Sequence, residues 1–186
     1  MTRKEVLEKQ RDEIITLFSN KSYPILIATD VASRGLDIDD IDLVINYDLA
    51  NDINVHTHRI GRTARAGKSG HAISLYNDYD ESRVDEFKEN RNIEFLSESD
   101  LRDEDFNLES DLKTIYISGG KKLKLRPADI LGCLIQDNGL EKDDIGKIKI
   151  FPMCSYVAIK KVAFEKKVKD LESLKIKGKF FRIFQR

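Results

Sequence analysis

ATDVASRGLDI (residues 28–38) and HRIGRTARAG (residues 58–67) place arginine, aspartate, threonine and glycine at the ends of predicted secondary-structure elements. In a layered α/β sheet, ligands bind where such residues follow the carboxyl ends of strands. Arg59, Arg62 and Arg65 fall within seven residues, and three guanidinium groups this close together do not fit inside a core. They predict a polyanionic ligand, namely nucleotide phosphate together with nucleic acid.

The apolar pattern around these stretches predicts helices that alternate with buried strands. The expected helices are 5–21, 55–66 (ended by Gly67) and 80–91 (capped by Asp80 or Ser82), and the expected strands are 23–28, 42–49 and 70–77. Continuous apolar runs such as YPILIA are typical of parallel strands that are buried on both faces. The alternation therefore indicates a parallel α/β sheet unit.

The charges of the 186 residues are strongly polarised along the chain. Residues 1–111 contain 14 Lys and Arg against 25 Asp and Glu, a net of −11, whereas residues 112–186 contain 18 against 8, a net of +10. Such a division predicts an acidic module joined to a basic module that binds a polyanion. The alternative is that the opposite charges only help two domains to pack together.

The basic half has its own pattern of elements. The expected order is strand 113–118, helix 127–137, strand 145–151, strand 155–161, helix 162–174 and strand 178–184. Pro127 in a first helical turn and the pair Asn138-Gly139 after the helix support these bounds. The order βαββαβ is that of the split βαβ unit and of the RNA-recognition motif. The fold expected for the chain is thus an α/β sheet domain followed by an α+β domain.

Cys133 and Cys154 have neither metal-like spacing nor neighbouring histidines, and no apolar stretch approaches membrane-spanning length. The start of the chain lacks the apolar segment of a signal peptide. We expect no metal site, no membrane association and a reduced, cytoplasmic location.

The first stretch suits nucleotide and nucleic-acid contacts. Asp37 is placed to accept hydrogen bonds from ribose hydroxyls, and Gly35 allows the turn that brings Arg34 to the same rim. Thr29 and nearby backbone N–H groups suit a phosphate of a bound strand. Asp30 has an equal alternative, which is to cap the following turn.

The second stretch places its arginines three residues apart, which on a helix puts them on one face. Facing a transferring phosphoryl group, such arginines stabilise the charge of the transition state. A plain surface stripe is the alternative. His58 suits either a structural or a coupling role, and His56 and His71 are expected at the surface.

Together the two stretches resemble motifs V and VI of the second RecA-like domain of DEAD-box RNA helicases. The resemblance implies that Thr29 and Arg34 contact RNA and that Asp37 meets the ribose of ATP. It also implies that Arg62 and Arg65 reach the γ-phosphate as arginine fingers, while His58 couples the nucleotide site to the partner domain. Ala64 stands where many family members have glycine.

The resemblance extends over residues 6–186. Glu8 and Arg11 match the family's QxxR region imperfectly, because Glu8 stands where glutamine is usual. The basic half is similar to the C-terminal RNA-binding domain of the DbpA/YxiN subgroup, which implies a hairpin of 23S ribosomal RNA in pre-large-subunit particles as the partner. The expected boundaries are 1–93 for the partial helicase domain, 94–111 for an acidic linker and 112–186 for the RNA-binding domain.

The basic half also predicts an RNA-binding loop from its residues alone. Gly119-Gly120 ends a strand and is followed by the cations Lys121, Lys122, Lys124 and Arg126. Such a cluster binds phosphates with a steep salt dependence. The strand SYVAIKK offers only Tyr156 as an aromatic residue, so the central strands supply few rings. Recognition through the loop, strand edges and RNA shape is expected instead of stacking on the sheet. Of Phe180 and Phe181, one is expected in the core and the other outside it.

The given sequence contains neither a GxxxxGK[ST] phosphate loop nor a DEAD tetrapeptide. The resemblance places both on an N-terminal RecA-like domain, together with the ligands of the Mg²⁺ that accompanies ATP. The chain is therefore expected to be the C-terminal part of an ATP-dependent RNA helicase and to hydrolyse no ATP by itself. The alternative function is a non-catalytic RNA-binding or assembly module.

Overall fold

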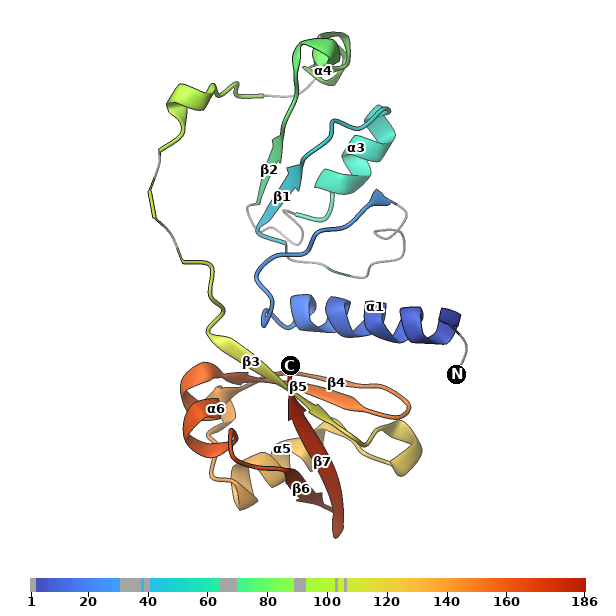
Figure 1. The fold of residues 1–186 in the computed structure, drawn as a ribbon, viewed down its shortest axis with the longest axis vertical. Coiled ribbons are helices and arrows are strands. Elements are labelled where there is room, and N and C mark those ends of the chain that lie inside the picture. The colour runs from blue at the N-terminus through green and yellow to red at the C-terminus, as the bar shows by residue number, and fades with distance from the viewer. Residues whose placement is uncertain are drawn as a thin grey trace. The chain divides into compact units, whose positions relative to one another are not determined.

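The computed structural model describes residues 3–30, 38, 41–63, 70–88, 93–102, 104–105 and 107–186 (Figure 1). The chain divides into two compact units, one formed by residues 1–33 with 106–186 and the other by residues 34–105. Arg34, Asp37 and Arg65, three of the predicted site residues, lie outside the described residues.

The larger unit is built on a five-stranded antiparallel sheet with the order β4-β5-β3-β7-β6. Its strands are β3 (Leu112–Ile117), β4 (Ile145–Ile150), β5 (Ser155–Lys160), β6 (Ser173–Ile176) and β7 (Lys179–Gln185). The helices are α5 (Pro127–Gly132), which continues into a π-helical segment (Cys133–Asp137), and α6 (Lys161–Lys167). Short 3-10 turns cover Lys121–Leu123 and Lys142–Asp144. The predicted α+β order is confirmed, with one strand added.

The added strand corrects the prediction of a helix over 162–174. The helix ends at Lys167, and Leu174 and Ile176 are buried in β6 while Lys175 between them is exposed. This period-two alternation belongs to a strand. Lys177 and Gly178 both have positive φ and connect β6 to β7 in a two-residue hairpin, which is the backbone that hairpin turns favour.

Sixteen buried hydrophobic residues form one core between the sheet and its helices. Ile115 and Ile117 of β3 and Val157 and Ile159 of β5 point into this core, and each is at most 1% exposed. Because side chains alternate along a strand, the residues between them lie on the opposite face of the sheet. Phe181 is buried in the core and Phe180 is 72% exposed, which confirms the expected division of this pair.

The predicted first helix is confirmed as α1 (Arg3–Ser19), but the predicted strand 23–28 is wrong. The chain turns back at once, because the backbone N–H groups of Ser22 and Tyr23 both donate to the carbonyl of Leu17. Residues 25–29 then form neither helix nor strand, and Ile27 is 94% exposed. A buried parallel strand needs hydrogen-bonding neighbours, and the two parallel strands of the chain belong to the other unit.

The smaller unit contains the parallel pair β1 (Leu43–Asn46) and β2 (His71–Ser74), which confirms two predicted strands. Between them lies α3 (Ile53–Ile60), where the Asp52 side chain caps the helix by accepting from the N–H groups of Asn54 and Val55. After β2 come a 3-10 turn (Asp78–Asp80) and α4 (Glu81–Lys88). Asn77 caps the 3-10 turn, and α4 follows the turn directly after Asp80. Asp80 or Ser82 as the cap of this helix stays a prediction.

The predicted fold class, a parallel α/β sheet followed by an antiparallel α+β domain, is confirmed. The domain boundaries at 93 and 112 stay a prediction. The compact units differ from them in that the first 33 residues pack with the C-terminal part of the chain.

Candidate nucleic-acid interface

The cationic loop begins at two glycines that pass unusually close to their neighbours. A Cβ on Gly120 would lie 2.2 Å from the carbonyl oxygen of Phe151, and one on Gly119 would lie 2.4 Å from the ring of Phe181. Since real Cβ atoms do not approach so closely, this backbone path requires glycine at both positions. The path brings the loop into hydrogen-bonding contact with the β4–β5 connection: the N–H groups of Lys121 and Lys122 donate to the carbonyls of Phe151 (2.9 Å) and Pro152 (2.9 Å).

The far end of the loop is equally fixed. The N–H of Lys124, in the left-handed region with φ 57°, donates to the carbonyl of Lys121 (2.9 Å), and the next residue, Leu125, is buried. The side chains of Lys121, Lys122, Lys124 and Arg126 are all exposed. The loop therefore presents its four predicted cations on a hydrogen-bonded backbone, so little backbone ordering entropy is lost when they bind phosphate.

A fifth cation, Lys177, lies beside the loop and was missed by the sequence reasoning. Its ammonium donates to the carbonyl of Lys124 (3.4 Å) and forms an ion pair with Asp129 (2.7 Å). Asp129 also accepts from the N–H of Arg126 at the start of α5 (2.9 Å). The hydrogen bond from Lys177 holds the pKa of the Asp129 carboxyl below its usual value. Recognition of the β6–β7 hairpin would have revealed this neighbour.

The sheet face opposite the helices carries more aromatic residues than predicted. Tyr116 pairs with Tyr156 on one side and with Phe184 on the other, with ring centroids 5.4 Å and 5.9 Å apart. The expectation that the central strands supply few aromatic residues is therefore wrong. The alternation in KTIYIS, with Ile115 and Ile117 directed to the core, was a sufficient signal for Tyr116.

The arginines of the second stretch take different positions. The predicted helix over 55–66 ends at Ile60, so Arg59 is helical while Arg62 follows in a turn. Arg59 lies against the end of β1, where its guanidinium donates to the carbonyl of Asp48 (2.8 Å) and to the side chain of Asn46 (3.5 Å). Arg59 thus has a structural function, and the expected single helical face is wrong for Arg59 and Arg62, while Arg65 lies outside the described residues.

Arg62 is half-buried and follows the helix directly, whereas His58 is exposed on α3. These two belong to the smaller unit. Thr29, which the sequence places at the same site, is exposed and belongs to the larger unit. The structure therefore does not test whether Thr29 shares a site with them.

His56 was expected at the surface, and this expectation is wrong. Its ring is buried and stacks on Phe87 of α4 at a centroid distance of 4.8 Å. The stacking joins α3 to the small core of this unit, which consists of Leu49, Val84 and Phe87 with Ile53 packed against it. His71 is exposed, as expected.

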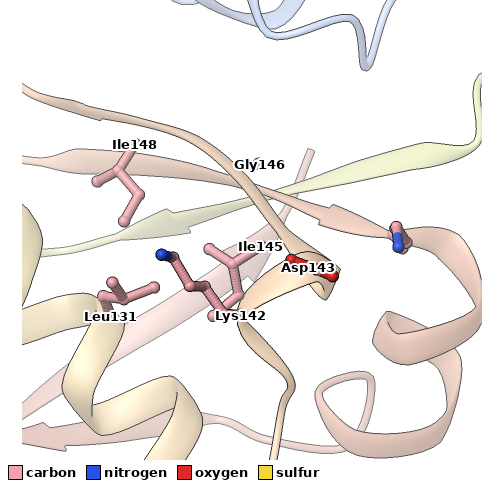
Figure 2. Close-up of a pocket in the computed structure, with 7 residues that line it drawn as sticks. Leu131, Lys142, Asp143, Ile145, Gly146 and Ile148 are labelled. Atoms are coloured by element: carbon pink, nitrogen blue, oxygen red, sulfur yellow. The ribbon is translucent and has the colours of Figure 1, made fainter.

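A shallow hollow lies between α5, the turn at residues 142–144 and the start of β4. Figure 2 shows Lys142 extended over it between Leu131 and Ile145, with its amine directed away from the carboxylate of Asp143. Its floor is apolar and its rim carries two amines, from Lys142 and Lys160. In the described part of the chain, no three His, Cys, Asp or Glu residues gather as a metal site would require. The hollow lacks a buried acid–base pair, so we assign it no catalytic role.

Two segments of the chain match models of known protein families. Residues 3–67 match the model of the helicase conserved C-terminal domain, and residues 114–184 match that of the DbpA RNA-binding domain. The chain is 44% identical over 177 residues to the ATP-dependent RNA helicase DbpA of Escherichia coli K12, an alignment that covers 95% of this chain and 39% of that protein. The chain corresponds to the C-terminal part of a DbpA-type DEAD-box helicase.

Further relatives agree with this family. The DbpA helicase of Bacillus subtilis 168 is 32% identical over 96% of this chain and 42% of its own length. The human ATP-dependent RNA helicase DDX42 is 57% identical over 68 residues, which are 37% of this chain and 7% of that protein. The chain thus spans about two fifths of the length of its DbpA-type relatives.

Among solved structures, the chain is similar to the E. coli DEAD-box protein SrmB in its complex with the regulator of ribonuclease activity A. The identity is 39%, the coverage is 46% of this chain and 50% of that chain, and the TM-score is 0.42. The helicase-type match contains Thr29, His58 and Arg62, while the DbpA-type match contains the cationic loop and the aromatic face.

No helix among the described residues is both long and apolar enough to span a membrane.

Proposed function

We propose that this chain acts within an ATP-dependent RNA helicase that binds 23S ribosomal RNA and remodels it during assembly of the large subunit. The observation that carries the proposal is the rigid, exposed cationic loop of a DbpA-type domain that follows a helicase-type segment in one chain. The loop supplies affinity for the phosphates of a folded RNA. The hairpin of 23S RNA as the target follows from the subgroup resemblance.

In this proposal the helicase-type segment forms one wall of an ATP site. A guanidinium suits the terminal phosphates of ATP, and Arg62 supplies one that is half-buried after α3. We assign the same contact to Arg65, a ribose contact to Asp37, RNA-backbone contacts to Thr29 and Arg34, and coupling to His58. ATP with Mg²⁺ supplies the phosphoryl group whose transfer drives remodelling. The Mg²⁺ ligands are assigned to an N-terminal RecA-like domain, which is the proposed partner of this chain in catalysis.

Within that site Arg62 stabilises negative charge, because its planar guanidinium presents several N–H donors to phosphate oxygens. Arg59 positions Arg62. Its hydrogen bonds to Asp48 and Asn46 fix the end of α3, and the chain leads from there directly to Arg62. We place the protein in the cytoplasm, in keeping with its two free, buried cysteines.

The test of the RNA target is a titration of the chain against 23S-derived hairpins and unrelated hairpins of equal length at matched salt. The proposal expects the 23S-derived hairpin to bind at least tenfold more tightly. Equal affinities would remove the 23S assignment and leave a helicase of other specificity.

The test of the ATP site is Arg62→Ala in an enzyme that also carries the phosphate-loop and DEAD motifs. Loss of an arginine finger lowers turnover by a factor of about 10³ or more, while hairpin affinity stays unchanged. The 186-residue chain alone is expected to hydrolyse no ATP. RNA-stimulated hydrolysis by the chain alone, or full activity of the variant, would contradict this assignment.

The second candidate function is a non-catalytic RNA-binding or assembly module. It is favoured by the C-terminal domain, which has a core of its own and a preformed loop. The two functions are distinguished by adding ATP with a domain that carries the missing motifs. Only the helicase function predicts that RNA unwinding then appears.

A further inference from the structure

The sheet face opposite α5 and α6 has the composition of a nucleic-acid surface. Tyr156, Tyr116 and Phe184 form a row of aromatic rings across three adjacent strands, with Phe151 next to Tyr156 (5.7 Å between centroids). The five strands contain no aspartate or glutamate at any position. Aromatic rings in edge-to-face and tilted contact, on strands without acidic residues, offer faces on which unpaired bases can stack.

Exposed cations accompany these rings. Arg186 lies 5.3 Å from the ring centroid of Tyr116, Lys149 lies 5.9 Å from that of Phe151, and Lys175 lies 5.8 Å from that of Phe180. All three cations are exposed, as is Arg182 of β7. Aromatic rings interleaved with cations bind the bases and the phosphates of a single strand together. Because the exposed charges of this face are positive, the face does not suit a partner protein with a basic surface.

Helix α1 covers part of this face, and Figure 1 shows it beside the sheet on the side away from α5 and α6. The Lys9 ammonium lies over the ring of Tyr116, 6.0 Å from its centroid. The Glu13 carboxylate forms an ion pair with Arg186 at 2.5 Å. A carboxylate thus occupies the place at Arg186 where the phosphate of a bound strand would lie.

The end of α1 is held by buried hydrogen bonds. The Asn20 side-chain amide donates to the Thr114 hydroxyl (2.8 Å), and the Ser22 hydroxyl lies 2.6 Å from the same oxygen. Under this cover Tyr156 is 2% exposed. Cys154 is buried nearby, where burial raises the pKa of its thiol and the Lys9 charge opposes this rise. These hydrogen bonds fix the position of α1 on the sheet, because buried polar groups need their partners.

We propose that this aromatic face is a second RNA surface, specific for single-stranded RNA, and that α1 is its intramolecular cover. The inference rests on the proposed RNA-binding function and adds a site separate from the cationic loop. The helix and the strand of RNA compete for the same rings and for Arg186. Since α1 lies within the helicase-type match, movement of this helix couples the helicase segment to RNA binding by the C-terminal domain.

The test measures binding of a fluorescein-labelled decauridylate to the full chain by anisotropy. The cover is weakened by Glu13→Gln with Asn20→Ala, and Asp12→Asn is the matched control, because Asp12 is an exposed carboxylate on the same helix. We expect the weakened cover to raise decauridylate affinity about tenfold and the control to leave it unchanged. Phe184→Ala, added to the weakened cover, is expected to lower the affinity about tenfold by removing one stacking ring.

Opening of the cover is measured independently by iodoacetamide alkylation of Cys154 at pH 8. Cys133, buried in the core on the other face, reports any general unfolding. We expect faster alkylation of Cys154 alone when the cover is weakened. An unchanged Cys154 rate would overturn α1 as the cover. Faster Cys154 alkylation with unchanged decauridylate affinity would overturn the single-strand surface.

A hairpin titration distinguishes failure of the second RNA surface from failure of the proposed function. Phe184→Ala is expected to leave hairpin affinity unchanged, whereas Lys121→Gln with Lys122→Gln is expected to lower it. Failure of the decauridylate results with intact hairpin results would overturn the second surface alone. Absence of hairpin binding would contradict the proposed function instead.

Discussion

The two regions of the chain differ most in how they build their interiors. Sixteen buried hydrophobic residues of 112–186 form one cluster, whereas the cluster in the described part of residues 34–105 has three members, Leu49, Val84 and Phe87. In the latter region Ile45 is 58% exposed and Tyr47 is 80% exposed. The C-terminal region can therefore keep a preformed binding loop by itself. The helicase-type region carries its charged motifs on a much smaller core.

The comparison is tested most strongly by removing a core side chain. Ile117 is fully buried in β3, so Ile117→Ala is expected to lower the free energy of unfolding of the C-terminal domain by about 2–5 kcal/mol. Urea denaturation followed by circular dichroism measures this change. Leu123→Ala, at a site that is 46% exposed, is the control and is expected to change the free energy by less than about 0.5 kcal/mol.

Hydrogen exchange shows whether the two regions unfold separately. With Ile117→Ala, amides of β3 and β5 are expected to exchange faster while those of β1 and β2 keep their rates. An equal increase in both regions would contradict two separate units.

The second prediction concerns the glycines. Gly120→Ala places a methyl group against the backbone carbonyl of Phe151, so the loop must shift, at a cost of about 1–3 kcal/mol. Gly132→Ala is the matched control, because a Cβ there meets nothing within 4 Å and the residue is helical. It is expected to stabilise the domain by about 0.4–1 kcal/mol. Hairpin affinity should fall only with Gly120→Ala, and equal effects of the two variants would show that the loop is not held by close packing.

The smallest effect is expected from the ion pair beside the loop. Asp129 has a lowered pKa because Lys177 donates to it. The stability that it contributes is therefore present above the ordinary carboxyl pKa of about 4 and is lost as the pH falls through the lowered value. Asp129→Asn should lower the thermal midpoint slightly at pH 7, and the difference from the unchanged protein should vanish in strong acid. A difference that grows on acidification would contradict this sign.

Much of the fold followed from local pattern. The continuous apolar runs of β1 and β2 and the alternation in KTIYIS each marked a strand, and Pro127 marked the start of α5. The predicted strand 23–28 and the end of the predicted helix 162–174 were wrong for one reason. An apolar run does not show which strand, if any, lies beside it. YPILIA has the composition of a buried strand, but a strand forms only beside a hydrogen-bonding partner. The predicted helix over 162–174 extends into the run ESLKIK (172–177), whereas pairing with β7 makes residues 173–176 a strand.

The candidate sites differ in the same way. The cations of the loop were predictable because Gly119-Gly120 and the adjacent charges are contiguous in sequence. The aromatic row was not recognised, since Tyr116, Tyr156 and Phe184 come from three strands far apart in sequence. Arg59 was misjudged because its partners, Asp48 and Asn46, precede it by 11 and 13 residues. Contacts that depend on the register between elements are not visible in a motif.

The central claim is that the C-terminal domain binds folded RNA through its preformed cationic loop. The most direct test is the hairpin affinity of the unchanged chain and of Lys121→Gln with Lys122→Gln over a range of salt concentrations. Each lost phosphate contact lowers the slope of log affinity against log salt by about 0.7–0.9. The account predicts weaker binding and a slope that is lower by about 1.5 in the variant. An unchanged affinity and slope would contradict it.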